Sequence, residues 1–121
     1  MKFKFNTILV KELSESLKFY TDILNLKPLD KFSPKEGINI VFLKDDDGNK
    51  FELIENKIEN KSFDRKSIVT LGFDVENLDQ TMDFLKQNNI KIAKGPVTIP
   101  NGRFIVIEDP NGVGIGLYEN L

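Results

Sequence analysis

The sequence predicts an α+β fold in which one βαβββ module occurs twice. Each half of the chain begins with alternating apolar and polar residues, followed by apolar residues at helical spacing. Each half ends in two strand-like runs joined by a glycine-containing turn, which indicates a β-hairpin. The two halves can also be aligned residue by residue, and internal repeats of this kind define a fold. We therefore expect a single domain over residues 1–121, with module one at 1–56, a linker at 57–66 and module two at 67–121.

Module one contains a predicted helix whose apolar side chains repeat at helical spacing. Leu13, Leu17 and Tyr20 form the stripe, and Leu24 extends it to a length of about three turns. The elements expected in this module are a strand at 3–10, the helix at 12–24, and strands at 38–43 and 50–54 that are joined by a turn at 45–49.

Module two shows the same order of elements. Leu78, Met82 and Leu85 carry its helical stripe. The strands expected around this helix are at 68–75, within 91–99, at 104–107 and at 113–118, the last two joined by a turn at 109–112.

The alignment of the two modules shows that they differ in length by one residue. Val10 corresponds to Val75 and Leu13 to Leu78, which are 65 positions apart, whereas Gly48 corresponds to Gly112 and Leu53 to Leu117, which are 64 positions apart. The difference must therefore lie between the helix and the hairpin. Strand, helix and turn agree in order, which supports an internal duplication.

Composition excludes several functional classes. The net charge of −2, with lysines and acids interspersed, does not suit a nucleic-acid partner. The absence of cysteine excludes disulfides and thiolate chemistry, and the absence of histidine removes the commonest transition-metal ligand and general base. No apolar run approaches the roughly 18 residues of a membrane span, and the first residues do not resemble a signal peptide. We therefore expect a cytoplasmic protein with no membrane partner.

Two segments resemble a known family. TILVKELSESLKFYTDILNL is similar to the opening strand and helix, and EDPNGVGIGLYE to the closing hairpin, of the vicinal-oxygen-chelate superfamily. This superfamily includes glyoxalase I, bleomycin-resistance proteins, fosfomycin-resistance enzymes and extradiol dioxygenases. The resemblance implies that the paired modules curl into an open mixed sheet around a cavity. It also implies that two chains pair side by side as a homodimer.

The resemblance also indicates where metal ligands would stand. The first-strand ligand falls on Phe5 in module one and Thr70 in module two, and the last-strand ligand falls on Glu52 and Gly116. Only Glu52 is a good ligand, and a catalytic metal site ordinarily needs about three protein ligands. We therefore expect no metal and no other cofactor.

Side chains alternate along a strand, so the residues of the predicted strands divide between two sheet faces. The set expected on the helix-covered face is almost wholly apolar: Ile8, Val10, Phe51, Leu53, Val69, Leu71, Phe73, Val75, Ile115 and Leu117. The set expected on the cavity face is mixed: Phe5, Thr7, Leu9, Glu52, Ile54, Thr70, Gly72, Asp74, Gly114, Gly116 and Tyr118. Strand glycines mark close approach by a ligand, or by another module or subunit. Both interpretations remain open.

The cavity face supplies the candidate site. Phe5 and Tyr118 are candidate stacking surfaces, and Glu52 is a candidate anchor or acid/base. Arg103 could bind an anionic group through two hydrogen bonds, or it could be a solvated edge residue. The expected ligand-binding residues are Phe5, Thr7, Glu52, Thr70, Gly72, Arg103, Gly114, Gly116 and Tyr118.

Three functions fit these observations. The first is a metal-independent small-molecule-binding protein of the glyoxalase/bleomycin-resistance type, which would sequester a drug or metabolite; Glu52 and Asp74 would complement a cationic ligand. The alternative is a lyase or isomerase of the same fold, with Glu52 as the acid or base or with an unusual metal site. The third is a partner-binding or regulatory domain in which side chains such as Phe5 and Tyr118 fill the cavity.

Overall fold

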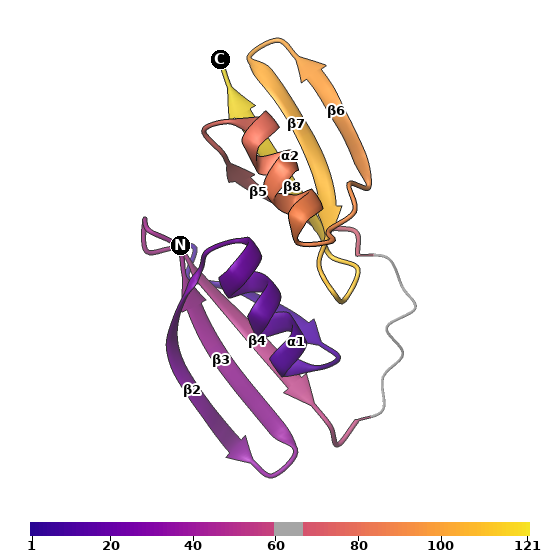
Figure 1. Ribbon diagram of the computed structural model, residues 1–121. Coiled ribbons are helices and arrows are strands. Elements are labelled where there is room, and N and C mark those ends of the chain that lie inside the picture. Colours follow the sequence, from indigo (N-terminus) through magenta and orange to yellow (C-terminus); the bar gives the residue numbers. More distant parts are fainter. Residues whose placement is uncertain (60–66) are drawn as a thin grey trace. The chain divides into compact units, whose positions relative to one another are not determined.

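The computed structural model describes residues 1–59 and 67–121, which form two compact units (Figure 1). The first unit comprises Met1–Asp64 and the second comprises Arg65–Leu121. Most of the predicted linker, residues 60–66, lies outside the described residues. Within the described part of the chain, no helix is long and apolar enough to cross a membrane.

The first unit is a four-stranded mixed sheet with one helical segment on one face (Figure 1). The strand order is β1-β4-β3-β2; β1 pairs with β4 in parallel, and the other pairs are antiparallel. Its elements in chain order are β1 (Asn6–Val10), α1 (Leu13–Lys18), the π-helical turn η1 (Phe19–Ile23), β2 (Lys27–Lys35), β3 (Ile38–Lys44) and β4 (Lys50–Asn56).

The second unit has the same topology. Its strand order is β5-β8-β7-β6, with β5 parallel to β8 and the other pairs antiparallel. Its elements are β5 (Thr70–Asp74), α2 (Leu78–Gln87), β6 (Lys94–Ile99), β7 (Gly102–Glu108) and β8 (Gly114–Asn120). The predicted α+β fold with a duplicated βαβββ module is therefore confirmed.

The hydrophobic core of each unit lies between its helix and its sheet. Strand β4 alternates buried and half-buried residues, as expected when one face is covered. The predicted helix-facing residues that are fully buried are Ile8, Val10, Phe51, Leu53, Ile115 and Leu117. Their burial agrees with the predicted face, and Leu71, Phe73 and Val75 are half-buried. Val69, which was predicted on the same face, precedes β5 and is 55% exposed. Among the described residues, no helix of the same unit covers the opposite face of either sheet. We call these surfaces the first and the second open face.

Strand β2 has no counterpart in the sequence prediction. All of its residues are exposed, it contains Pro28 and Pro34, and its pairing with β3 has two register shifts. Proline is tolerated on edge strands because the missing N–H faces solvent. An edge strand without a buried face lacks the alternation by which the other strands were recognised.

The structure locates the one-residue difference between the modules. The helices begin at Leu13 and Leu78, which are 65 positions apart, and end before Asn25 and Asn89, which are 64 apart and have positive φ of 58° and 59°. The additional residue therefore lies inside the first helical segment, and the prediction that it lies between the helix and the hairpin is wrong. There the N–H of Leu24 donates to the carbonyl oxygen of Phe19, five residues earlier, at 3.3 Å. A π-helical turn accommodates one inserted residue in this way.

Candidate functional site

On the first open face, a carboxylate is held by a neighbouring hydroxyl. Thr7 of β1 is paired with Glu52 of β4, and its Oγ1 donates to Glu52 Oε1 at 2.7 Å. Within residues 1–59 and 67–121, the second carboxylate oxygen of Glu52 makes no hydrogen bond. The half-buried carboxylate thus has a fixed orientation and an oxygen available for a ligand.

A cluster of aromatic rings lies next to this carboxylate. Phe42 of β3 is the cross-strand partner of Glu52, and Phe5 packs edge-on against it with ring centroids 5.3 Å apart. Phe32 of β2 is stacked parallel to Phe42 at 6.4 Å. Phe32 is 49% exposed and Leu9, on the same face, is 51% exposed. The first open face therefore presents apolar rings to solvent beside one negative charge.

The second open face is built around Tyr118. A Cβ placed on Gly116 would lie 2.7 Å from Tyr118 Cε1, and one placed on Gly72 would lie 3.5 Å from the same atom. The tyrosine ring therefore lies over both glycines. It is also stacked on Phe104, with ring centroids 5.0 Å apart and planes 24° apart. The space left by these two strand glycines is thus taken up by a side chain of the same unit.

The other candidates of the second unit are also engaged locally. A Cβ on Gly114 would lie 2.9 Å from the Oγ1 of Thr70, its cross-strand partner. Asp74 accepts a hydrogen bond from the side-chain amide of Asn120 at 3.1 Å. These contacts bring together Thr70 with Gly114, and Gly72 and Gly116 with Tyr118.

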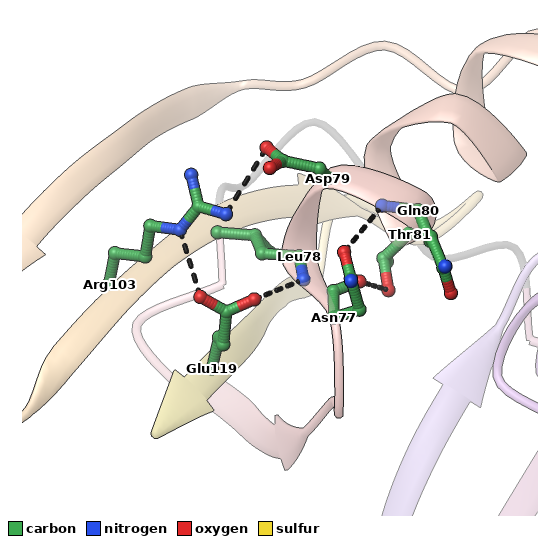
Figure 2. Close-up of polar contacts among 7 residues, drawn as sticks. All are labelled: Asn77, Leu78, Asp79, Gln80, Thr81, Arg103 and Glu119. Atoms are coloured by element: carbon green, nitrogen blue, oxygen red, sulfur yellow. Dashed lines mark hydrogen bonds and ion pairs between the residues drawn. The ribbon is translucent and has the colours of Figure 1, made fainter. Parts of the chain in front are cut away.

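Arg103 lies apart from these residues, on the helix-covered face (Figure 2). Its Nε donates to Glu119 Oε1 at 3.0 Å, and its Nη2 lies 3.1 Å from Asp79 Oδ1. Glu119 Oε2 accepts from the backbone N–H of Leu78, the first residue of α2, at 2.6 Å. The bond from Arg103, followed by that from the Leu78 N–H, lowers the pKa of Glu119 below its usual value. The bonds to Glu119 and then Asp79 raise the pKa of Arg103.

The first unit contains the same arrangement. Glu55 Oε2 accepts from the N–H of Leu13 at 2.7 Å, and Glu55 Oε1 accepts from the side-chain amide of Asn39 at 3.0 Å. Asn39 and Glu55 each stand 64 positions before Arg103 and Glu119. In both units, therefore, a glutamate of the last strand satisfies the N-terminus of the helix. The position of Arg103 is explained by this structural role.

Sequence reasoning missed four residues of the open faces. Phe42 and Phe32 in the first unit, and Phe104 and Lys94 in the second, lie beside the predicted residues. Phe42 and Phe104 stand opposite Glu52 and Tyr118 across the hairpins. Applying the two-residue period to the third strand of each module would have found both of them.

The positions at which the resemblance places metal ligands do not fit a metal ion. The Phe5 ring packs on Phe42, Glu52 is bonded to Thr7, the Thr70 hydroxyl lies against Gly114, and Gly116 has no side chain and is covered by Tyr118. Among the residues described, there is also no group of three or more His, Cys, Asp or Glu side chains arranged to hold a metal. A single carboxylate falls short of the ligand number that a metal site needs.

Two shallow hollows lie elsewhere, at the C-terminal end of α2. They have volumes of about 500 and 520 Å³ and share Asn89, Ile90 and Lys91 in their linings. Neither is lined by a residue predicted for the site. Apart from Arg103, the candidate residues therefore lie on the open faces and not in these hollows.

Comparison with known proteins identifies the family. The model of the Glyoxalase/Bleomycin resistance protein/Dioxygenase superfamily matches residues 3–117. Because the match spans nearly the whole chain, the protein belongs to this superfamily, and the predicted resemblance is confirmed. A comparison with curated protein sequences finds no match.

Solved structures share the fold. A glyoxylase/bleomycin resistance protein/dioxygenase domain from Frankia sp. EAN1pec is 17% identical, with a TM-score of 0.79 over 100% of this chain and 98% of that one. The fosfomycin resistance protein FosX from Listeria monocytogenes is 17% identical, with a TM-score of 0.81 over 99% and 92%. TnmS3, an antibiotic binding protein from Streptomyces sp. CB03234, is 16% identical, with a TM-score of 0.74 over 100% and 97%.

Proposed function

We propose that this protein binds a small molecule without the help of a metal ion, as a sequestering or carrying protein. The observation that carries the proposal is the first open face, where the Thr7-held carboxylate of Glu52 lies beside Phe5 and Phe42. Sites for small molecules typically combine an apolar lining with a few placed polar groups. The proposed contacts in the first unit are Phe5, Thr7, Glu52, Phe32 and Phe42.

The chemistry of this face favours a flat ligand that carries a cation or a hydrogen-bond donor. Aromatic pairs contribute about 0.5–1.5 kcal/mol beyond their buried area, and a hydrogen bond to a charged group contributes about 1.5–3 kcal/mol. Lys44 and Lys50 form the neighbouring cross-strand pair on this face. Both are exposed, so water and salt screen their charge from Glu52.

Two structural neighbours lend support. FosX is a fosfomycin resistance protein and TnmS3 is an antibiotic binding protein, so this fold occurs in a resistance protein and in a protein that binds an antibiotic. Family membership is also the ground for proposing that two chains form a homodimer, which analytical ultracentrifugation would test.

The experiment compares a planar cation with its uncharged parent ring. Proflavine is cationic at neutral pH and acridine is uncharged, while both have the same fused ring system. We expect wild type to bind proflavine more tightly, and Glu52→Gln to weaken proflavine binding about tenfold, equivalent to about 1.4 kcal/mol. Acridine affinity should change little, because the rings remain. Dissociation constants are measured by fluorescence titration.

The control is Glu15→Gln, which removes one negative charge from the exposed surface of α1 in the same unit. This variant should bind proflavine as wild type does. The proposal fails if wild type binds neither dye, or if Glu15→Gln and Glu52→Gln weaken proflavine binding to the same extent.

A further inference from the structure

The duplication pairs the Thr7–Glu52 contact of the first unit with two glycines of the second. Thr7 corresponds to Gly72, 65 positions later, and Glu52 corresponds to Gly116, 64 positions later. Gly72 and Gly116 are cross-strand partners, as Thr7 and Glu52 are. The second unit therefore lacks both polar side chains at the place where the first unit holds its carboxylate.

Tyr118 occupies the space that these two side chains would fill. A Cβ on Gly116 would lie 3.3 Å from the hydroxyl oxygen of Tyr118, so this oxygen stands directly over the position equivalent to Glu52. Stacking on Phe104 helps to hold the Tyr118 ring in this position. Within residues 1–59 and 67–121 the hydroxyl has no hydrogen-bond partner, although a phenol both donates and accepts.

Charged groups share the second open face with this hydroxyl. Lys94 of β6 pairs with Val106 of β7, which in turn pairs with Gly116 of β8. The Nζ of Lys94 lies 5.8 Å from the centre of the Phe104 ring. Asp74, the neighbour of Tyr118 on β5, is bonded to the Asn120 amide. Glu108 is exposed at the end of β7, in the row of Gly114. The phenol of Tyr118 and the ammonium of Lys94 thus come from the two strands that flank β7, and both lie near the half-buried ring of Phe104.

We infer that Tyr118 is a ligand-contacting residue that donates its hydroxyl hydrogen to an oxygen acceptor on an aromatic ligand, with Lys94 favouring acceptors that are anionic. This inference rests on the proposed function, because it assigns a ligand class to the second open face. The two faces then differ in chemistry: Glu52 accepts, and Tyr118 donates. Gly116 of β8 is required because any side chain at this position would displace the ring.

The test uses two dyes that share one skeleton. Anilinonaphthalene sulfonate carries an anionic acceptor, and phenylnaphthylamine is the same molecule without it. Both dyes become fluorescent when bound, so the full-length protein can be titrated directly. Tyr118→Phe removes only the hydroxyl and keeps the ring on the glycines. We expect this variant to bind the sulfonate about three- to tenfold more weakly, and phenylnaphthylamine as wild type does.

Tyr20→Phe is the matched control, because it removes a hydroxyl from a tyrosine that is fully buried in the first unit. The chain has two tyrosines and no tryptophan, so the intrinsic emission of this control comes from Tyr118 alone. The bound sulfonate should quench that emission.

Three results would overturn the inference. Tyr118→Phe could leave sulfonate binding unchanged, it could weaken both dyes equally, or the sulfonate could bind without quenching Tyr118. If wild type binds the naphthalene dyes but neither acridine dye, the proposal for Glu52 fails and that for Tyr118 stands. If no dye binds, both fail.

Discussion

The two glycines beneath Tyr118 differ in how closely they approach its ring. The Cβ of an alanine would be 2.7 Å from Tyr118 Cε1 at position 116 and 3.5 Å at position 72. The first distance requires the ring to shift, and the second is an ordinary contact. Because the ring is stacked on Phe104, a shift also disturbs that pair. Gly116 is therefore needed for the conformation of Tyr118, and Gly72 is not.

Alanine substitutions should separate these two positions. We expect Gly116→Ala to lower the free energy of unfolding by about 1–3 kcal/mol, since overpacking typically costs about this much. Gly72→Ala should be neutral, or stabilise by about 0.5 kcal/mol through the lower entropy of the unfolded chain. Urea denaturation measures both values. Equal destabilisation by the two alanines would show that the ring does not rest on Gly116.

Sequence patterns predict such residues only in part. Alternation placed Gly72, Gly116 and Tyr118 on one face, and the structure agrees. Alternation does not specify a rotamer, so nothing in the pattern indicated that Tyr118 bends back over the glycines. Arg103 shows the same limit. Its strand was predicted, but its orientation depends on Glu119 and Asp79, which come from other elements.

Among the elements, each helix depends on a strand for its N-terminal cap. Glu12 precedes α1 and makes no side-chain capping bond, so Glu55 of β4 supplies the acceptor for Leu13. In the second unit Asn77 caps Gln80, while Glu119 of β8 accepts from Leu78 (Figure 2). An anion at a helix N-terminus also interacts favourably with the helix dipole. These bonds fix each helix against the last strand of its own unit.

The cap in the second unit should make stability depend on pH. The pKa of Glu119 is lower in the folded state than its ordinary value of 4.5, chiefly because of the bond from Arg103. The unfolded chain therefore takes up this proton first as pH falls. The stabilisation by Glu119 is fully present above its unfolded pKa, and it is lost as pH falls below about 4.5 toward the folded pKa.

Glu119→Gln should remove this pH-dependent contribution to the stability of the fold. The variant should have a lower thermal midpoint than wild type near neutral pH, and the difference should shrink as the solution is acidified through that window. Glu108→Gln, a change at an exposed glutamate of β7, serves as the control and should follow the wild-type curve. A constant difference between Glu119→Gln and wild type at every pH would contradict the assigned role. Melting curves by circular dichroism suffice.

Elements were predicted where packing leaves a periodic trace. Strands β1, β3, β4, β5, β7 and β8 and both helices follow from apolar spacing. Strand β2 was not predicted, because none of its residues is buried. The length difference was detected from Leu13 and Gly48, but its cause was not. A π-helical turn leaves the apolar stripe nearly intact, so only the backbone hydrogen bond of Leu24 reveals it.

At the scale of the whole molecule, the duplicated modules share their structural residues and differ in those of the open faces. The pairs Val10 and Val75, Leu53 and Leu117, and Glu55 and Glu119 keep the same type of side chain. In contrast, Thr7 is aligned with Gly72, and Glu52 is aligned with Gly116. Residues that hold each unit together are thus the same in both modules. The residues of the open faces, in contrast, differ in polarity and charge between the modules.

This divergence leads to a prediction about metals for the complete protein. Four family positions now hold phenylalanine, glutamate, threonine and glycine, which do not form a set of ligands. We expect dialysis against a chelator to leave both the thermal midpoint and the proflavine affinity unchanged. Zinc, manganese and nickel should likewise not raise the midpoint. A metal that binds the folded protein and is present at a free concentration of about one hundred times its Kd would stabilise the fold by about 2.7 kcal/mol. The thermal midpoint would then rise by several degrees, which differential scanning calorimetry resolves easily. Stoichiometric metal in the purified protein, lost on Glu52→Ala, would overturn the prediction, because Glu52 is the one acidic side chain left at these positions.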